Sequence, residues 1–161
     1  MSKKYIHMGN DCFYKSCFVP IKNRPMFTKP SGGLWASPVD AEFGWKDWCE
    51  REDFSKGDMR KSFTFSLSDE ARVIHLCSVA DLVSLPDQEQ PKGFEDLSLG
   101  KCIDFEKMVD DGYDAIELHL SEEKLDGINY LEGLYWKLCG WDCDSILIMN
   151  PEVVVVDDGK E

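Results

Sequence analysis

Two apolar, β-branched runs stand near the C-terminal end of the sequence, and a single proline separates them. The first run is DSILIMN (144–150), and the second, EVVVVDD (152–158), follows directly after Pro151. β-Branched residues favour strands, whereas proline lacks the N–H group that a central strand must donate. The chain must therefore build a sheet, and Pro151 must lie at a bend or an edge of it.

Other strand-like and helix-like patterns alternate along the 161 residues without a linker or a repeat. Period-two alternation and apolar runs predict strands, and helical spacing predicts helices. The predicted strands cover 4–9, 34–37, 62–67, 71–78 and 113–120, and the predicted helices cover 38–51, 104–111 and 128–138. The polar, turn-rich segment 84–100 is predicted to be an exposed loop. The sequence therefore predicts one α+β domain over residues 1–161.

The helix predicted over 38–51 has the clearest start signal. Ser37 occupies the N-cap position, Pro38 follows as the first helical residue and Asp40 lies at the third helical position. Trp45 and Trp48 then recur at helical spacing. We expect these two rings to pack in the core against the sheet.

The charge of the chain limits its partners. The sequence has 31 acidic and 18 basic residues, a formal net charge of −13. Such a surface repels nucleic acid and anionic membranes, and it attracts basic proteins. We therefore expect a basic protein partner, no direct nucleic-acid binding and no membrane binding. The alternative is that the acidity only keeps the protein soluble.

The cysteines indicate a reducing environment. There are seven of them, an odd number, and no C-x-x-C spacing occurs. The N-terminal segment lacks the apolar region of a signal peptide, and no apolar run is long enough to cross a bilayer. We expect reduced thiols, a cytoplasmic location and no metal site.

Four segments, taken together, resemble a known family. They are the first predicted strand with His7, the segment GGLWAS (32–37), the segment GYDAIEL (112–118) and the segment DCDSILIMNPEVVVV (142–156). In order and placement they resemble mono-ADP-ribosyltransferase-fold proteins. The chain is similar in particular to the small, divergent phage and bacterial members, which include anti-CRISPR ADP-ribosyltransferases.

This resemblance implies a fold and an activity. The fold would be an ADP-ribosyltransferase-like split β-sandwich with short flanking helices, which clasps NAD in a cleft. The activity would be NAD-dependent mono-ADP-ribosyltransfer to a protein target, with a phage-encoded, anti-CRISPR-like effector as the implied setting. No G-x-G-x-x-G motif is present, so NAD would not be bound in the manner of a dinucleotide-binding fold.

Two carboxylates are candidate catalytic residues. Cleavage of the bond between nicotinamide and ribose produces an oxocarbenium-like sugar, which a carboxylate stabilises. Asp144 is the first candidate because the apolar strand directly after it would anchor it. Glu132 is the second, since the predicted helix places it near Ile128 and Trp136. The alternatives are that Asp144 only caps a turn and that Glu132 is a charge on the helix surface.

The resemblance assigns NAD contacts to the first two predicted strands. His7 would orient the ribose, Met8 and Gly9 would also contact NAD, and Trp35 and Ser37 would shape the nicotinamide side. Each residue also has an ordinary structural interpretation. His7 is equally explained as a half-buried histidine with satisfied hydrogen bonds, and Ser37 as the helix N-cap described above.

Three other ionisable residues receive no functional role from the sequence. Glu117 alternates with apolar neighbours and is predicted to lie on the solvent face of its strand, and His75 and His119 are interpreted as ordinary strand residues.

A second function also remains open, that of a non-catalytic acidic protein that inhibits a basic partner by mimicking nucleic acid. Aspartates at 142 and 144, where the family usually has glutamate, favour this alternative.

Overall fold

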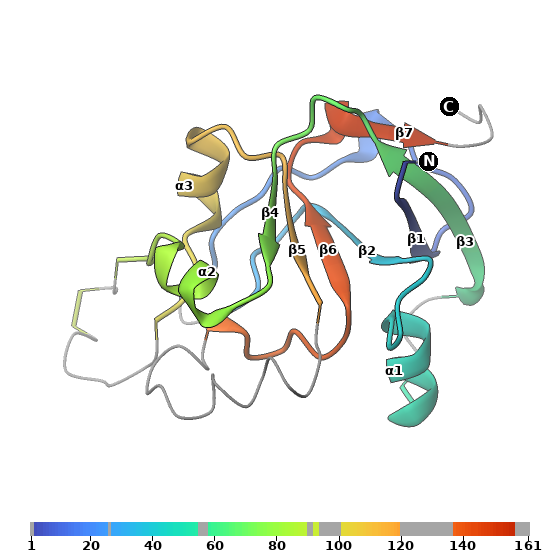
Figure 1. Cartoon of the computed structure of the whole chain (residues 1–161), viewed down its shortest axis with the longest axis horizontal. Helices are drawn as coiled ribbons and strands as arrows, with labels where there is room; N and C mark the ends of the chain where they lie inside the picture. Colours follow the sequence, from blue (N-terminus) through green and yellow to red (C-terminus); the bar gives the residue numbers. More distant parts are fainter. Residues whose placement is uncertain are drawn as a thin grey trace.

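A computed structural model of the protein describes residues 2–25, 27–54, 58–89, 92–93, 101–119 and 137–156. Seven strands and a few short helices make up this part of the chain, which confirms the α+β class (Figure 1). The strands are β1 (Lys4–Gly9), β2 (Leu34–Pro38), β3 (Asp58–Leu67), β4 (Val73–Leu76), β5 (Ala115–Leu118), β6 (Ser145–Ile148) and β7 (Val154–Val156). The α-helices are α1 (Trp45–Arg51), α2 (Val79–Ser84) and α3 (Phe105–Asp110), and the 3-10 helices are η1 (Lys15–Cys17) and η2 (Pro151–Val153).

All seven strands belong to one mixed sheet in the order β4-β5-β6-β2-β1-β3-β7. Only β4 and β5 run parallel, and every other neighbouring pair is antiparallel. The sheet curls, so that β1 and β3 lie to one side of β4, β5 and β6 (Figure 1). Because β1 is flanked by β2 and β3, the first strand of the chain holds a central position.

Each side of the sheet carries its own hydrophobic cluster. On the side that α2 and α3 cover, here called the helix face, strand residues such as Ile116 and Leu147 pack against Leu82 and Phe105. The opposite side, here called the Tyr5 face, carries Tyr5 and the strand residues Phe63, Phe65, Ala115, Ile146 and Ile148. All four residues of β5 and all four of β6 are buried, because both of their faces are covered.

The proline between the two late strands lies where the sequence predicts a bend. Pro151 is the first residue of η2, and the Asn150 side chain accepts a 3.0 Å hydrogen bond from the Glu152 N–H. This turn separates β6, which lies inside the sheet, from β7, which lies at its edge beside β3. The prediction from the two β-branched runs is confirmed.

The predicted start of the first α-helix is wrong. Pro38 continues β2 and pairs with Tyr5, and α1 begins only at Trp45, with Gly44 as its N-cap. The Ser37 hydroxyl still accepts a hydrogen bond from the first helical N–H, that of Trp45, at 2.9 Å. Strand pairing therefore overrides the local capping signal, and the serine serves the same helix from a neighbouring strand.

The other predictions differ from the structure mainly in their boundaries. α3 follows Asp104 and ends before Gly112, as expected, while β4 and β5 are shorter than 71–78 and 113–120. The sequence did not predict α2. Most of the predicted helix 128–138 and much of the predicted loop 84–100 lie outside the described residues. No helix within the described ranges is long and apolar enough to cross a membrane.

Candidate functional site

A fully buried glutamate lies in the middle of the sheet. Glu117 is the third residue of β5, its side chain is 0% exposed and it points to the Tyr5 face. The prediction that Glu117 lies on the solvent face of its strand is therefore wrong. Glu117 does alternate with the β5 residues on the helix face. The opposite face of β5 is not open to solvent, however, because side chains from β1 and β4 cover it. A buried carboxylate is costly unless charged or polar groups surround it.

Four side chains surround this carboxylate, and they form with it what is here called the Glu117 cluster. Its Oε1 atom lies 2.7 Å from Lys3 Nζ and 3.2 Å from His119 Nε2. Its Oε2 atom lies 2.9 Å from His75 Nδ1 and accepts a 3.3 Å hydrogen bond from the Tyr5 hydroxyl. The cluster therefore joins two residues near the N-terminus to three residues between positions 75 and 119. In the sheet, β2 and β6 lie between β1, which carries Tyr5, and the strands β4 and β5.

The phenol of Tyr5 is fixed as a hydrogen-bond donor. Burial raises its pKa most, and the negative charge of Glu117 raises it further. A phenol that resists ionisation keeps its proton, so Tyr5 donates to Glu117 over the whole physiological pH range. To reach β5 from β1, the ring extends across β2 and β6, which the curl of the sheet permits.

The cluster has the geometry of an acid–base group. His75 Nδ1 lies 2.9 Å from Glu117 Oε2, so the Nε2 atom of the same ring is directed away from Glu117. This side chain is 54% exposed, whereas the carboxylate beneath it is shielded from water. A carboxylate that orients an accessible imidazole is a recurring arrangement for proton transfer.

Sequence reasoning missed this site because no local motif marks it. The only signal is that His75 and Glu117 each alternate with apolar residues in short strands, and that His119 follows Glu117 at a spacing of two. The parallel register of β4 and β5, which pairs His75 with Glu117 directly, is what brings them together. A pairing of this kind is not encoded near either residue.

His7 lies on the Tyr5 face as well, in a separate group of contacts. Its Nδ1 atom donates a 2.7 Å hydrogen bond to the carbonyl oxygen of Trp35, and its Nε2 atom accepts one of 3.2 Å from the Asn10 amide. Its ring centroid lies 5.1 Å from that of Phe63. Burial lowers the pKa of His7, which favours the neutral imidazole.

Of the other four residues predicted to contact NAD, Gly9 ends β1 and has no side chain, and the remaining three do not share this face. Strand alternation and the β1–β2 register place Met8, Trp35 and Ser37 on the helix face, opposite His7. The Trp35 ring packs edge-on against Trp141 at a centroid distance of 4.9 Å, under the Lys29 ammonium. The sheet therefore separates the His7 imidazole from the Trp35 indole.

The two predicted catalytic carboxylates have different outcomes. Asp144 directly precedes β6, is 5% exposed, and its backbone N–H donates a 2.9 Å hydrogen bond to the carbonyl of Phe43. It is therefore anchored as the sequence suggests, but it presents little surface to a ligand. Glu132 lies outside the described residues.

The two tryptophans of α1 are not in the core. Trp45 and Trp48 stack on each other at 5.0 Å, and both meet Phe54 edge-on. All three keep part of their surface accessible, and the buried residue of α1 is Cys49. The prediction that these two rings pack in the core is wrong, because α1 projects beyond the ends of β1 and β3 (Figure 1).

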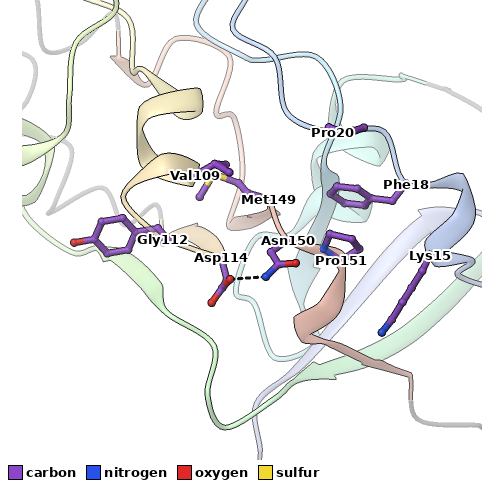
Figure 2. Close-up of a pocket in the computed structure, with 10 residues that line it drawn as sticks. Lys15, Phe18, Pro20, Val109, Gly112, Asp114, Met149, Asn150 and Pro151 are labelled. Atoms are coloured by element: carbon purple, nitrogen blue, oxygen red, sulfur yellow. Dashed lines mark hydrogen bonds between the residues drawn. The ribbon is translucent and has the colours of Figure 1, made fainter.

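A surface pocket of about 400 Å³ lies on another part of the molecule (Figure 2). The Asn150 amide donates a 2.7 Å hydrogen bond to Asp114 in its wall, and Lys15 and Phe18 line it from the opposite side. The second Asp114 oxygen accepts from the Arg72 N–H at 2.8 Å. The carboxylate of Asp114 is thus used to join β5 to the turn after β6, and none of the predicted site residues lines this pocket.

Comparisons with known proteins add no relative. Neither protein-family models, nor curated proteins, nor solved structures gave a match. Within the part of the chain that the structure describes, no three His, Cys, Asp or Glu side chains are arranged to hold a metal ion. The geometry of the described residues therefore carries the functional argument.

Proposed function

We propose that the protein is an NAD-dependent mono-ADP-ribosyltransferase that modifies a protein target. The finer fold, an ADP-ribosyltransferase-like split β-sandwich, and the phage-encoded, anti-CRISPR-like setting are part of this proposal. The curled, mixed sheet with its central first strand is compatible with it. The observation that carries the proposal is the state of His7 on that strand.

The orientation of the His7 ring suits it to accept a hydrogen bond from a hydroxyl group. Its Nδ1–H is used by the Trp35 carbonyl, so the ring is held in one orientation and Nε2 keeps a lone pair. Asn10, an exposed residue, now donates to that lone pair. A ribose hydroxyl that takes the place of the Asn10 amide would find a neutral acceptor already positioned.

The carboxylate in this reaction is assigned to Asp144. Attack on the ribose carbon breaks the bond to nicotinamide, and a negative charge nearby stabilises the positive charge that develops on the sugar. The anchoring of Asp144 at the start of β6 supports this assignment, and its low exposure argues against it. The experiment below therefore measures binding and turnover separately.

The test is calorimetric titration of the protein with NAD, together with nicotinamide release as the turnover assay. We expect His7→Gln to weaken NAD binding about tenfold, because glutamine cannot offer the fixed imidazole acceptor. Asp144→Asn is expected to retain binding and to lose turnover. Thr64→Ala, on β3 and pointing to the opposite face from His7, is the matched control and should bind NAD as the wild type does.

Absence of NAD binding by the folded wild type would refute the enzyme and favour the second candidate, a non-catalytic acidic interaction protein. The observation that favours this candidate is the partly exposed stack of Trp45, Trp48 and Phe54 on a chain of net charge −13. Aromatic side chains beside a charged surface are typical of protein interfaces. Such binding would weaken strongly as the salt concentration rises.

A further inference from the structure

The Glu117 cluster presents positive and ionisable groups to solvent above a buried carboxylate. The side chains of Lys3, His75 and His119 are 37%, 54% and 33% exposed, while that of Glu117 is 0% exposed. All three contact one or the other oxygen of the same carboxyl group. The exposed parts of these three side chains are therefore held close together at one place on the surface. The carboxylate beneath them is not in contact with solvent.

The hydrogen-bonding roles within the cluster differ between its two histidines. The Lys3 ammonium, which can only donate, lies 3.0 Å from His119 Nε2. In a neutral His119 this nitrogen accepts, so its proton is carried on Nδ1, away from Lys3. His75 uses Nδ1 towards Glu117, and its Nε2 atom gains an outward proton when the ring becomes charged. Protonation of His75 thus adds an outward donor, whereas protonation of His119 adds positive charge with the new proton on Nε2, beside Glu117.

The net charge of the cluster depends on its two imidazoles. Lys3 and Glu117 neutralise each other, so two neutral imidazoles leave the cluster uncharged. Each protonated imidazole adds one positive charge. The cluster then becomes a cationic spot on a chain whose net charge is −13.

The remaining titratable groups around the cluster do not cancel this change. Tyr5, from β1, stays neutral because burial and Glu117 raise its pKa. Asp40, after β2, is close enough for its charge to act on Tyr5, and it adds one negative charge at the edge. β4 contributes His75, and β5 with the residue after it contributes Glu117 and His119.

We propose that Lys3, His75 and His119, held around Glu117, form a binding site for an oxyanion, either free or as the phosphate group of a larger ligand. The site fills best when both imidazoles are protonated. It shares no residue with the contacts of His7, so it stands or falls independently of NAD binding.

Sulfate is the probe for the experiment, because it keeps both negative charges across the pH range in which histidine titrates. Sodium sulfate is titrated against chloride at constant ionic strength, at about pH 5.5 and about pH 8, so that general screening is held fixed. The readout is the imidazole NMR signals. The chain has only three histidines, and His7 serves as an internal reference. We expect saturable shifts of the His75 and His119 signals that are at least tenfold tighter at the lower pH.

Two variants test the assignment of the cationic groups. Lys3→Gln is expected to weaken sulfate binding about tenfold. Lys4→Gln removes the same charge from the next residue, whose backbone alternation directs it to the opposite face, and it should bind as the wild type does. If Lys3→Gln fails to fold, His75→Gln tests the same site through a half-exposed side chain whose loss leaves the buried carboxylate its other partners.

A second probe distinguishes the source of the anion. Phenyl phosphate that binds more tightly than sulfate would assign the site to the phosphate group of a larger ligand, and equal affinity would assign it to a free anion. The proposal is overturned if sulfate moves no His75 or His119 signal, if it moves the His7 signal equally, or if Lys4→Gln weakens binding as much as Lys3→Gln does.

Discussion

At the scale of single residues, Glu117 shows how burial changes the meaning of a sequence pattern. In isolation, a glutamate that alternates with Ala115, Ile116 and Leu118 indicates a strand with one solvent face. In the protein the same glutamate is covered by Tyr5, by His75 from β4 and by Lys3, the residue before β1. A carboxylate is tolerated there because both of its oxygens face hydrogen-bond donors or positive charge.

Removal of this carboxylate should destabilise the fold. Glu117→Ala leaves a cavity and takes the acceptor from Tyr5, Lys3 and His75, so we expect the free energy of unfolding to fall by about 3 kcal/mol. Glu152→Ala is the matched control. Its ion pair with Lys15 is exposed on both sides, and its loss should cost at most about 0.5 kcal/mol. Urea denaturation of the three proteins measures both values, and equal stability of the two variants would contradict the structural role of Glu117.

At the scale of elements, the segment around β2 shows tertiary contacts overriding local signals. Ser37 and Pro38 carry a helix-start pattern, yet they complete a strand because Ile6 and Tyr5 pair with them. Gly33, just before β2, adopts a φ of +72° and donates its N–H to the Val19 carbonyl at 2.8 Å. The glycine pair thus makes a turn that packs tightly against β6 and against the segment before it.

A side chain at Gly33 should not fit. A Cβ atom there would lie 2.6 Å from Leu147 Cδ1 and 2.9 Å from the Ile148 carbonyl oxygen, in a conformation that disfavours L-residues. We expect Gly33→Ala to lower the melting temperature by about 10 °C or more, from about 3 kcal/mol of steric and backbone strain. Gly9→Ala has a positive φ but no atom within 4 Å of the added Cβ. Calorimetry should therefore show a clearly smaller loss in Gly9→Ala, and an equal loss would mean that steric contact is not the cause.

At the scale of the whole molecule, the sheet divides the chain into two faces with separate contents. Trp35 belongs to the cluster of the helix face, and Tyr5 and His7 belong to the other face.

The cysteines of the described residues differ in how deeply they are buried. Cys17 and Cys77 are exposed, whereas Cys49 and Cys143 are buried, and burial raises the pKa of Cys143 to about 12.

This distribution predicts the order of thiol modification. In the native protein near pH 8, Cys17 and Cys77 should react with a maleimide or iodoacetamide reagent within minutes, and Cys49 and Cys143 should react only as the protein unfolds. The cause is lack of access, together with the raised pKa values that burial gives both inner thiols. Peptide mass spectrometry over a time course measures the order. Rapid native labelling of Cys143 would contradict its placement beside β6.

Elements with local causes can be predicted from the sequence alone. Apolar runs predict strands β1, β3 and β6. Pro151 predicts the bend before β7, and Asp104 and Gly112 predict the two ends of α3. These features follow from side-chain and backbone preferences within a few residues.

Tertiary contacts set where β2 ends and α1 begins, on which face His7 and Trp35 lie, and that His75 lies beside Glu117. The physical reason is the same in each case. Strand order and register bring together residues far apart in the chain, and the free energy gained by pairing and burial exceeds the local preferences that the sequence displays. The candidate sites depend on this long-range assembly, so no short motif could have placed the Glu117 cluster.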